Sequence, residues 1–509
     1  MSQIELSETL NCYSIADIRA LEAYAIEKQG VPAIQLMKNA GRAAFDEIKE
    51  RWPEPETLHI FCGGGNNGGD GFIVAGLAVD SGWDVRIVDL SDPSKMSDEA
   101  ASAREFALQR TNSVVTEVPD LSNAFGIVVD ALLGIGFSGE IRGAVLQACR
   151  AINQSWMPVF ALDVPSGVNA DTGACAIDAV EAEVTISYIA AKRGLLTGAA
   201  ENCVGELVIE DLGVNELSIQ TLQPHEILTE DLLDEVFPRR FPSAHKGAYG
   251  HLLIVGGNTG MSGATILATE AALALGVGKI SVATREPTLA PLLARIPEAM
   301  AHRVDHYNDL EPLLNQCTAV VVGPGLGKDS WAEQMLLRVM EEDIPLVVDA
   351  DAINLIAEGK IEVSQERICF TPHPGEAAKV LGISASEVQE NRFAAIAALE
   401  EKIPGHWLLK GNGSLLTRAE PEGSAAYLNI TGNPGMASGG MGDVLSGLIG
   451  SVLAQGYEVE QSAKAGLFIH GAAADIAAEV VGEISLKATD LVAAVPEVLH
   501  APGFEDVLD

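Results

Sequence analysis

Short apolar runs of strand character alternate with longer stretches of helical periodicity, and this alternation constrains the fold more than any other feature. Strands separated by helices form βαβ units, in which the strands lie parallel in one sheet with helices over its faces. The chain is therefore predicted to have an α/β fold with mostly parallel sheets. In the first half we expect strands at residues 57–62, 84–90, 126–132, 158–164 and 183–189. In the second half we expect strands within residues 251–257, 279–285, 319–327, 345–352, 367–376 and 406–414.

The alternation is interrupted at residues 213–247, which carry Pro224, Pro238 and Pro242 and show no long apolar period. We interpret this stretch as a linker or crossover. The 509 residues then form two α/β domains in tandem. Residues 441–455 have the apolar spacing of a long helix, and we expect this helix to close the chain.

The charge of the chain limits its partners. Lys and Arg total 32 and Asp and Glu total 71, which gives a formal net charge of −39. Nucleic acids and anionic membranes would be repelled by this charge, so we expect no nucleic acid and no membrane as a partner. A ligand that carries phosphate must be held by backbone N–H groups, helix N-termini and a few placed cations.

The seven cysteines are widely spaced and form no CxxC pair, which favours reduced thiols over a disulfide framework or a cysteine zinc site. The start of the chain shows no signal-peptide pattern, and no apolar run approaches the ~18 residues of a transmembrane helix. We therefore expect a soluble, cytoplasmic enzyme.

The first glycine-rich loop contains a GxGxxG pattern at Gly63, Gly65 and Gly68. This pattern belongs to the dinucleotide-binding fingerprint, but by itself it is weakly specific. Residues 66–70 are polar where the following helix would begin to pack on the sheet, so the loop can offer amides and a carboxylate to a ligand. The alternative is a tight turn in which Asp70 only caps the helix.

Two further strands of the first domain end in acidic residues, Asp130 and Asp163, and Ser166 follows shortly after the second. The ligand crevice of an open parallel sheet lies beyond the carboxyl ends of its strands, so these side chains and Asn67 are expected to share one pocket. Their amide, carboxylate and hydroxyl oxygens suit a hard cation, and nothing in the set suits zinc. A purely structural role for each strand-end Asp is the alternative.

The most informative segment is NPGMASGGMGDVLSGLIG at residues 433–450. Gly439, Gly440 and Gly442 lead into the expected helix and place Asp443 in its first turn. Glycines before a helix let successive N–H groups face an anion, and the helix dipole favours negative charge there. A carboxylate at this position can take a proton from a hydroxyl that attacks phosphorus. The alternative is an Asp that only stabilises the helix dipole.

Other residues of the second half are less decisive. Lys410 follows an apolar strand within a glycine turn, where it could contact nucleotide phosphate or ribose or simply be solvated. His373 lies between two prolines, which fix its backbone, and it could bind a ligand or be structural. Asp349 and Asp351 could cap a helix or bind cation-linked water. The patterns GxxxxGK[ST], HExxH and GxSxG are absent from the sequence.

Taken together, the motifs resemble one family over nearly the whole chain: the bifunctional NAD(P)H-hydrate repair enzymes. These fuse an epimerase for NAD(P)HX, which is NADH or NADPH hydrated at C6 of the nicotinamide ring, to an ADP-dependent NAD(P)HX dehydratase. The first half carries the matching strings GGGNNGGDG, VDALLGIGFSG and LDVPSG. The second half carries HKGAYGHLLIVGG, GMSGATILA, GPGLG, VVDADA, TPHPGE, KGNGS and NPGMASGGMGDVLSG. The resemblance implies two tandem three-layer α/β domains, a Rossmann-like epimerase at residues 1–222 and a ribokinase-like dehydratase at residues 223–509.

In the first domain, the resemblance implies interconversion of the R and S hydrates. Asp163 would be catalytic and lie near the reacting centre. A potassium ion would be held by Asn67, Asp130 and Ser166. The substrate would be bound by Asn66, Asn67, Gly68, Gly69, Asp70, Gly134, Ile135, Gly136, Phe137, Ser138, Gly139, Glu140 and Asp163.

In the second domain, the resemblance implies phosphorylation of the C6 hydroxyl of the S hydrate by ADP as co-substrate, with Mg²⁺, followed by loss of phosphate. Asp443 would deprotonate the hydroxyl, and the amides around Gly440 to Gly442 would stabilise the transferring phosphoryl group. The hydrate would be bound by Ala264, Gly327, His373 and Asp443. The nucleotide would be bound by Lys410, Gly411, Asn412, Gly413, Ser414 and Gly442.

The implied partners are the small molecules NADHX, NADPHX and ADP, and we also expect a homo-oligomer. Three other interpretations are compatible with the motifs. The second domain could be a small-molecule kinase for a vitamin precursor, with the first domain as an accessory. The first domain could bind ligand without turning it over. The GxGxxG pattern, taken literally, could serve a flavin or nicotinamide oxidoreductase.

Overall fold

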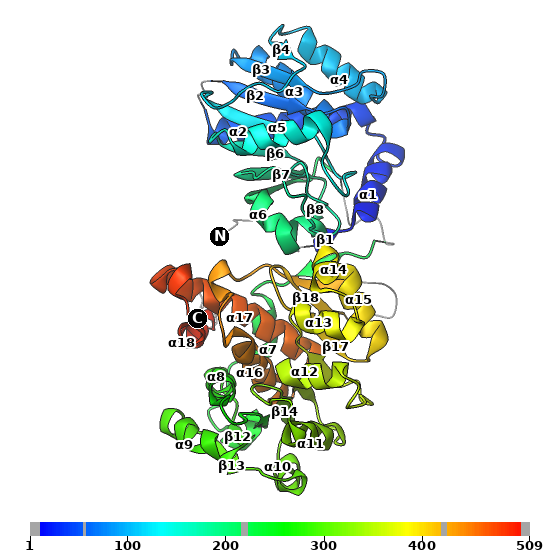
Figure 1. Ribbon diagram of the computed structural model, residues 1–509. Helices are drawn as coiled ribbons and strands as arrows, with labels where there is room; N and C mark the ends of the chain where they lie inside the picture. The colour runs from blue at the N-terminus through cyan, green and yellow to red at the C-terminus, as the bar shows by residue number, and fades with distance from the viewer. Residues whose placement is uncertain (1–10, 54–56, 215–221, 419–424, 500–509) are drawn as a thin grey trace. The chain divides into compact units, whose positions relative to one another are not determined.

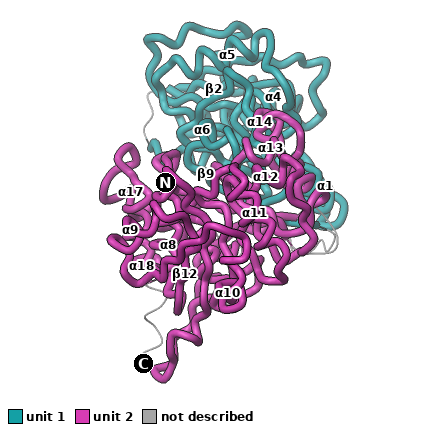
Figure 2. The backbone as a smooth tube through the Cα atoms, turned by 60° about the horizontal axis from the view of Figure 1, so that its bottom comes forward, with its two compact units in different colours: residues 1–225 teal, residues 226–509 magenta. Residues whose placement is uncertain are grey.

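The chain forms two compact units, which we call unit 1 and unit 2 (Figures 1 and 2). Unit 1 spans residues 1–225 and unit 2 spans residues 226–509. The sequence placed its domain boundary nearby, after residue 222. The computed structural model describes residues 11–53, 57–214, 222–418 and 425–499.

Unit 1 is built on a sheet with the strand order β4-β3-β2-β5-β6-β7-β9, in which all neighbours are parallel. Its strands are β2 (Leu58–Cys62), β3 (Val85–Asp89), β4 (Val114–Val115), β5 (Ile127–Ala131), β6 (Val159–Leu162), β7 (Val184–Tyr188) and β9 (Glu206–Glu210). All the strands expected in this half are confirmed. The two edge strands, β4 and β9, were not expected, because β4 is very short and β9 has a charged residue at each end. A separate parallel pair joins β1 (Asn11–Tyr13) and β8 (Ala191–Lys192).

Helices cover both faces of this sheet. They are α1 (Ile15–Glu27), α2 (Ala33–Arg51), α3 (Asn66–Asp80), α4 (Asp98–Leu108), α5 (Gly143–Asn153) and α6 (Glu201–Val204). Leu58, Ile60 and Cys62 of β2 pack with α2, α3 and α4, whereas Phe61 packs with α5 in a second cluster. Successive strand residues point to opposite faces. The sheet is therefore the middle layer of three.

Unit 2 contains strands in the order β13-β12-β11-β14-β15-β16-β17-β18-β19-β10. Strands β13 to β17 are parallel, β18 is antiparallel to both neighbours, and β10 is parallel to β19. They are β10 (His225–Ile227), β11 (His251–Val255), β12 (Lys279–Thr284), β13 (Met300–Arg303), β14 (Ala319–Val322), β15 (Leu346–Val348), β16 (Ile368–Phe370), β17 (His406–Leu409), β18 (Ser414–Thr417) and β19 (Ala426–Asn429). The expected strands are confirmed, and β10, β13, β18 and β19 are additions to them.

Both faces of the second sheet are also buried. Leu252 and Ile254 of β11 join a core with α8, α16, α17 and α18, while Leu253 and Val255, which point the other way, are fully buried as well. The helices are α7 (Leu232–Val236), α8 (Ser262–Ala274), α9 (Glu286–Arg295), α10 (Glu311–Leu314), α11 (Ser330–Met340), α12 (Ala350–Ala357), α13 (Pro374–Leu381), α14 (Ala385–Glu390), α15 (Arg392–Lys402), α16 (Met441–Ala454), α17 (Val459–Val481) and α18 (Ala488–Val498). The predicted fold class, two tandem three-layer α/β domains, is confirmed.

Two expectations about connecting segments were wrong. The stretch at residues 213–247 is more than a linker, because β10 pairs with β19, and Leu233 and Val236 of α7 join the core of unit 2. Its few apolar residues show no period, because they pack on a core supplied by distant segments; residues 215–221 lie outside the described part. The helix α16 is confirmed but does not close the chain, since α17 and α18 follow it.

No helix in the described part of the chain is both long and apolar enough to cross a membrane.

Candidate active sites

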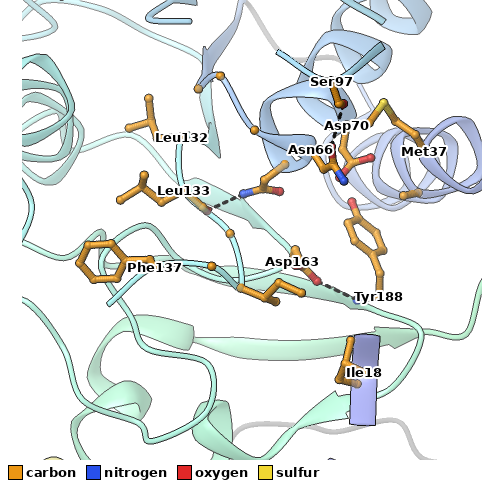
Figure 3. Close-up of a pocket in the computed structure, with 18 of the residues that line it drawn as sticks. Ile18, Met37, Asn66, Asp70, Ser97, Leu132, Leu133, Phe137, Asp163 and Tyr188 are labelled. Atoms are coloured by element: carbon orange, nitrogen blue, oxygen red, sulfur yellow. Dashed lines mark hydrogen bonds between the residues drawn. The ribbon is translucent and has the colours of Figure 1, made fainter. Parts of the chain in front are cut away.

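A cavity of about 880 Å³ opens beyond the carboxyl ends of β2, β5, β6 and β7 in unit 1 (Figure 3). Loops that follow these strands supply most of its wall, and α1, α2 and a few residues of other segments supply the rest. This is the place where the parallel-sheet argument put the ligand crevice. Residues from the sequence-predicted set that line it are Asn66, Asn67, Asp70, Gly134, Ile135, Gly136, Phe137, Ser138, Glu140 and Asp163.

The glycine loop brings the start of α3 to this cavity. The helix begins at Asn66 after Gly65, and Asp70 lies inside the helix, so the alternative that Asp70 caps it is wrong. A Cβ at Gly63 would lie 1.9 Å from the Leu132 carbonyl oxygen, and one at Gly68 would lie 2.0 Å from the Gly63 carbonyl oxygen. These glycines are therefore required by close backbone packing, which holds the first-turn N–H groups of α3 at the cavity.

Two other predicted binding residues belong to these loops. Gly69 has a packing role, and Gly139 lies at the rim of the cavity. A Cβ at Gly69 would lie 2.6 Å from the Met37 Cε atom, so this glycine lets α2 approach α3. Gly139 has a φ of +86°, which glycine tolerates, and it lies on the exposed part of the loop after β5.

Asp130 and Ser166 are hydrogen-bonded to each other, and Leu133 links them to Asn67, because its N–H donates to Ser166 Oγ and its carbonyl accepts from Asn67 Nδ2. The Ser166 hydroxyl donates to Asp130 Oδ1 at 2.6 Å, and the Ser166 N–H donates to Asp130 Oδ2 at 2.7 Å. Burial raises the pKa of Asp130 to about 6, against the lowering effect of hydrogen bonds from Ser166 and Leu132. The groups that donate hydrogen bonds to the Asp130 carboxylate are neutral, so none of them balances its negative charge.

The amide of Asn67 adds a further observation. Its Nδ2 donates to the Leu133 carbonyl at 2.6 Å, while its Oδ1 is buried without a hydrogen-bond partner among the described residues. An orphaned amide oxygen, a buried carboxylate and a hydroxyl oxygen form a negative, oxygen-lined set that fits a hard cation. This oxygen chemistry is compatible with the potassium ion that the sequence resemblance implies.

Asp163 occupies a strained position at the end of β6, with a φ of +61°. Its carboxylate forms an ion pair with Lys192, at 2.7 Å between Oδ1 and Nζ, and accepts a long hydrogen bond of 3.4 Å from the Tyr188 N–H. Lys192 is only 1% exposed and also donates to Ser187 Oγ and to the Tyr188 carbonyl. A buried lysine thus fixes the carboxylate of the predicted catalytic residue.

Further acidic groups surround this ion pair. Burial, followed by the charges of Asp163 and Glu22, raises the pKa of Asp70 well above its usual range. Burial, followed by the charge of Asp163, also raises the pKa of Glu22. Carboxyls whose environments differ in this way can divide acid and base roles between them.

In unit 2, Asp443 lies in the first turn of α16, as the sequence predicted. The preceding residue Gly440 has a φ of +95°, a conformation that favours glycine. Burial, followed by the charge of Asp349, raises the pKa of Asp443 to about 7, and the charge of Lys410 opposes the shift. Asp443 is therefore poised to accept a proton near neutral pH.

The Asp349 side chain connects four of the sequence motifs of the second half: its own and those that contain Thr371, Lys410 and Ser446. Its Oδ1 accepts from Thr371 at 2.8 Å and pairs with Lys410 Nζ at 2.9 Å, and its Oδ2 accepts from Ser446 at 2.7 Å. The sequence did not decide whether Asp349 caps a helix or binds cation-linked water. Its side chain makes no helix cap, and it positions Lys410 beside α16 instead.

The predicted nucleotide-binding residues 410–414 form the turn between β17 and β18. Gly411 and Gly413 both have positive φ, at +132° and +56°. The Arg392 guanidinium, which is fully buried, donates to the carbonyls of Leu409, Lys410 and Gly413. Gly442 lies beside this turn, because a Cβ there would lie 3.1 Å from Lys410 Nζ.

Three other predicted hydrate-binding residues, Ala264, Gly327 and His373, lie in the first turn of α8, in the loop after β14 and at the start of α13. The Gly327 N–H donates to Asp351 Oδ2 at 2.9 Å, and a Cβ at nearby Gly325 would lie 3.3 Å from the Ala264 Cβ, so these segments touch. His373 caps α13, with Nδ1 accepting from the Gly375 N–H at 3.0 Å, and its side chain remains 56% exposed. Its ring is thus oriented and accessible, although one nitrogen is used by the cap.

Comparison with known proteins identifies the family. Family models match residues 33–194, as a YjeF-related protein N-terminus, and residues 252–497, as an NAD(P)H-hydrate dehydratase. The bifunctional NAD(P)H-hydrate repair enzyme of Coxiella burnetii is 44% identical over 94% of this chain and 97% of its own length. The chain belongs to the bifunctional NAD(P)H-hydrate repair enzyme family.

Other comparisons agree with this family membership. The bifunctional NAD(P)H-hydrate repair enzyme of Escherichia coli is 38% identical over 95% of this chain and 93% of its own length. A solved structure of a hypothetical protein of Streptococcus mutans, 28% identical, aligns with a TM-score of 0.50 over 54% of this chain and 98% of its own.

Within this repair-enzyme chain, sequence reasoning missed several residues that the structure places at the two sites. Lys192 and Tyr188 lie at or just after an expected strand end, so the strand-end rule that found Asp163 could have found them. Asp349 was noticed without a role. Arg392 gave no signal, because it sits at the start of α15 among ordinary helical residues.

Proposed function

We propose that the chain repairs hydrated NADH and NADPH with two activities. Unit 1 interconverts the R and S hydrates, and unit 2 dehydrates the S hydrate at the expense of ADP. Family membership over nearly the whole chain supports this assignment. The observation that carries it is Asp443, a carboxylate with a pKa near 7 at the start of α16, beside Lys410 and a glycine run.

In unit 1, we propose that the hydrated ring enters the cavity with its reacting carbon near Asp163. Lys192 orients this carboxylate through the 2.7 Å ion pair. Potassium would be held by Asn67 Oδ1, the Asp130 carboxylate and Ser166 Oγ. The ion would supply positive charge that balances the buried Asp130 and fixes the adjoining loops.

In unit 2, we propose that Asp443 takes the proton of the C6 hydroxyl while that oxygen attacks the β-phosphorus of ADP, which enters as its Mg²⁺ complex. The bond from the β-phosphorus to the bridging oxygen breaks, and AMP leaves. Amides at the start of α16 and the Lys410 ammonium stabilise the charge on the transferring group. Burial alone lowers the pKa of Lys410, but Asp349 beside it raises the value overall, so the ammonium is retained.

The second half of the reaction is an elimination. The C6–O bond breaks with release of phosphate, C5 loses a proton, and the C5–C6 double bond of NAD(P)H is restored. Phosphorylation is needed because hydroxide leaves poorly and phosphate leaves well. Ala264, Gly327 and His373 are proposed to hold the hydrate during this step.

The test is recovery of NADH absorbance when the protein and ADP are added to a mixture of R and S hydrates. Full recovery, faster than spontaneous epimerisation allows, is expected. Recovery of the S fraction alone would refute the epimerase assignment. A phosphorylated product that accumulates from ATP would instead support the small-molecule kinase.

Two variants separate the activities. Asp443→Asn is expected to abolish dehydration and to leave epimerisation intact, because the attacking hydroxyl loses its base. Asp163→Asn is expected to stop epimerisation only. Retained dehydration in the first variant would remove Asp443 from the mechanism, and loss of both activities in either variant would indicate misfolding.

We also propose a cytoplasmic location and self-association into a homo-oligomer. The unpaired cysteines support a reducing compartment, since all seven are free thiols in the structure. Fractionation of the source cells and light scattering of the purified protein test these two points.

A further inference from the structure

One polar group that lines the unit 1 cavity has no hydrogen-bond partner within the described part of the chain, and the acidic side chain of Asp70 lines the same cavity. The Tyr188 hydroxyl oxygen is buried and unpaired among the described residues, and the whole residue is 5% exposed. Asp70 is 8% exposed. Most buried polar groups in proteins are paired, so an unpaired buried hydroxyl at a cavity calls for an explanation.

The position of Tyr188 is set by the ion pair at the predicted catalytic residue. Its N–H donates to Asp163 Oδ1 at 3.4 Å, and its carbonyl accepts from Lys192 Nζ at 2.9 Å. With the backbone held on both sides, the ring reaches from β7 toward α3, and Figure 3 shows its hydroxyl pointing toward Asp70. The hydroxyl is therefore placed by the same contacts that orient the Asp163 carboxylate.

An unpaired buried hydroxyl destabilises the folded chain, because its lost hydrogen bonds to water are not replaced. A ligand that supplies the missing hydrogen bonds would remove this destabilisation. The Tyr188 hydroxyl therefore marks a point of the wall where substrate would make contact.

The charges near the Tyr188 hydroxyl indicate the chemistry of that ligand group. The cavity wall carries Arg19 and Arg142 as well as acidic residues, but the charges that act on Tyr188 are those of Asp70, Asp163 and Glu210. Lys192 already pairs with Asp163. An anionic group would be repelled here. Burial, with the neighbouring Asp163 and Glu22, raises the pKa of Asp70, so its carboxyl is favoured in the neutral form, which can both donate and accept.

The Tyr188 hydroxyl also both donates and accepts. Burial, followed by the charges of Asp70 and Asp163, raises its pKa and keeps it protonated. A ligand group complementary to these two neighbours must be neutral and must itself offer a donor and an acceptor. A primary carboxamide has this combination, and a carboxylate does not.

We propose that Tyr188, together with Asp70, binds the carboxamide of the hydrated nicotinamide ring and makes unit 1 selective for the amide over the corresponding acid. This inference deepens the proposed epimerase function and rests on it. Tyr188 is thereby a specificity-determining residue in addition to the substrate-binding residues expected from the sequence.

The first test is Tyr188→Phe in the full chain, with R and S hydrates of NADH followed by chromatography in the absence of ADP. We expect about a tenfold loss in kcat/KM for interconversion, mainly through KM, because one hydrogen bond to substrate is lost. The matched control is Tyr24→Phe on α1, outside the cavity lining, which should match the wild type. Dehydration by unit 2 should be unchanged in both variants, which checks that they fold.

The second test replaces the substrate with the hydrates of reduced nicotinic acid adenine dinucleotide, in which a carboxylate replaces the carboxamide. The wild type is expected to interconvert these hydrates at least about a hundredfold more slowly. Equal rates for amide and acid, or a Tyr188→Phe variant that equals the wild type, would overturn the inference. If the wild type accelerates interconversion of neither substrate, the epimerase assignment itself fails, which is a separate outcome.

Discussion

At the scale of single residues, the two sites use carboxylates whose surroundings rather than identities decide their roles. Asp443 is held near neutral pKa by burial and by Asp349, and Asp163 is held by an ion pair with Lys192. The sequence could name both residues from their positions at element ends. It could not supply their partners, which come from other loops.

The raised pKa of Asp443 predicts the pH dependence of dehydration. A general base works in its ionised form, so kcat/KM is expected to fall as pH decreases through about 7 and to level off above it. The measurement is initial dehydration rate against pH at low hydrate concentration. Asp351→Asn should move the midpoint downward, because the Asp351 charge contributes to the raised pKa. A midpoint near pH 4 in the unaltered chain would contradict Asp443 as the base.

The oxygen set at Asn67 predicts a dependence on potassium. Replacing potassium chloride with tetramethylammonium chloride at equal ionic strength is expected to slow epimerisation about tenfold or more and to leave the dehydration site unaffected. Asn67→Leu removes the orphaned oxygen and should abolish the salt effect. Asn39→Leu, on the exposed face of α2, is the control. Equal epimerisation rates in both salts would exclude the cation.

At the scale of elements, the sequence located strands well and located their partners poorly. Apolar runs identified the parallel strands at the centre of each sheet, because buried strands carry continuous apolar residues. Strands β18 and β19, inside the second sheet, and the short strands β4 and β10 escaped. The turn at residues 410–414 was found by its glycines, whereas its support from Arg392 was not.

The hydrogen bonds from Arg392 to the turn at residues 410–414 predict the effect of Arg392→Met. Three backbone carbonyls would lose a buried donor, so unit 2 should lose about 3 kcal/mol of unfolding free energy. The turn would also loosen, and KM for ADP should rise. The measurements are denaturant unfolding and dehydration kinetics. Epimerisation serves as the internal control, and an unchanged KM for ADP would show that the turn does not contact the nucleotide.

At the scale of the whole molecule, each unit has its own buried core. The unit 1 cluster around α2, α3 and α4 and the unit 2 cluster around α8, α16 and α17 share no residue. Because the cores are separate, each unit can have its own stability, and one chain can carry two different active sites.

Calorimetry of the full chain is therefore expected to show two unfolding transitions. ADP with Mg²⁺ at about 100 times its Kd should stabilise only the transition of unit 2, by about 2.7 kcal/mol. A single transition that shifts as a whole would show that the units unfold together. The Arg392→Met variant provides an independent assignment, because only the unit 2 transition should fall.

The sequence by itself determined the α/β class, the tandem order, the central parallel strands and the loops that carry polar residues. These features depend on local composition and spacing, which are readable along the chain. The tertiary structure decided which side chains meet. Lys410 and Ser446 reach Asp349 across 61 and 97 residues of chain, and Lys192 reaches Asp163 from a different strand end. Such contacts follow from sheet order and strand register, so the partners that set charge and orientation at both sites appear only once the chain is folded.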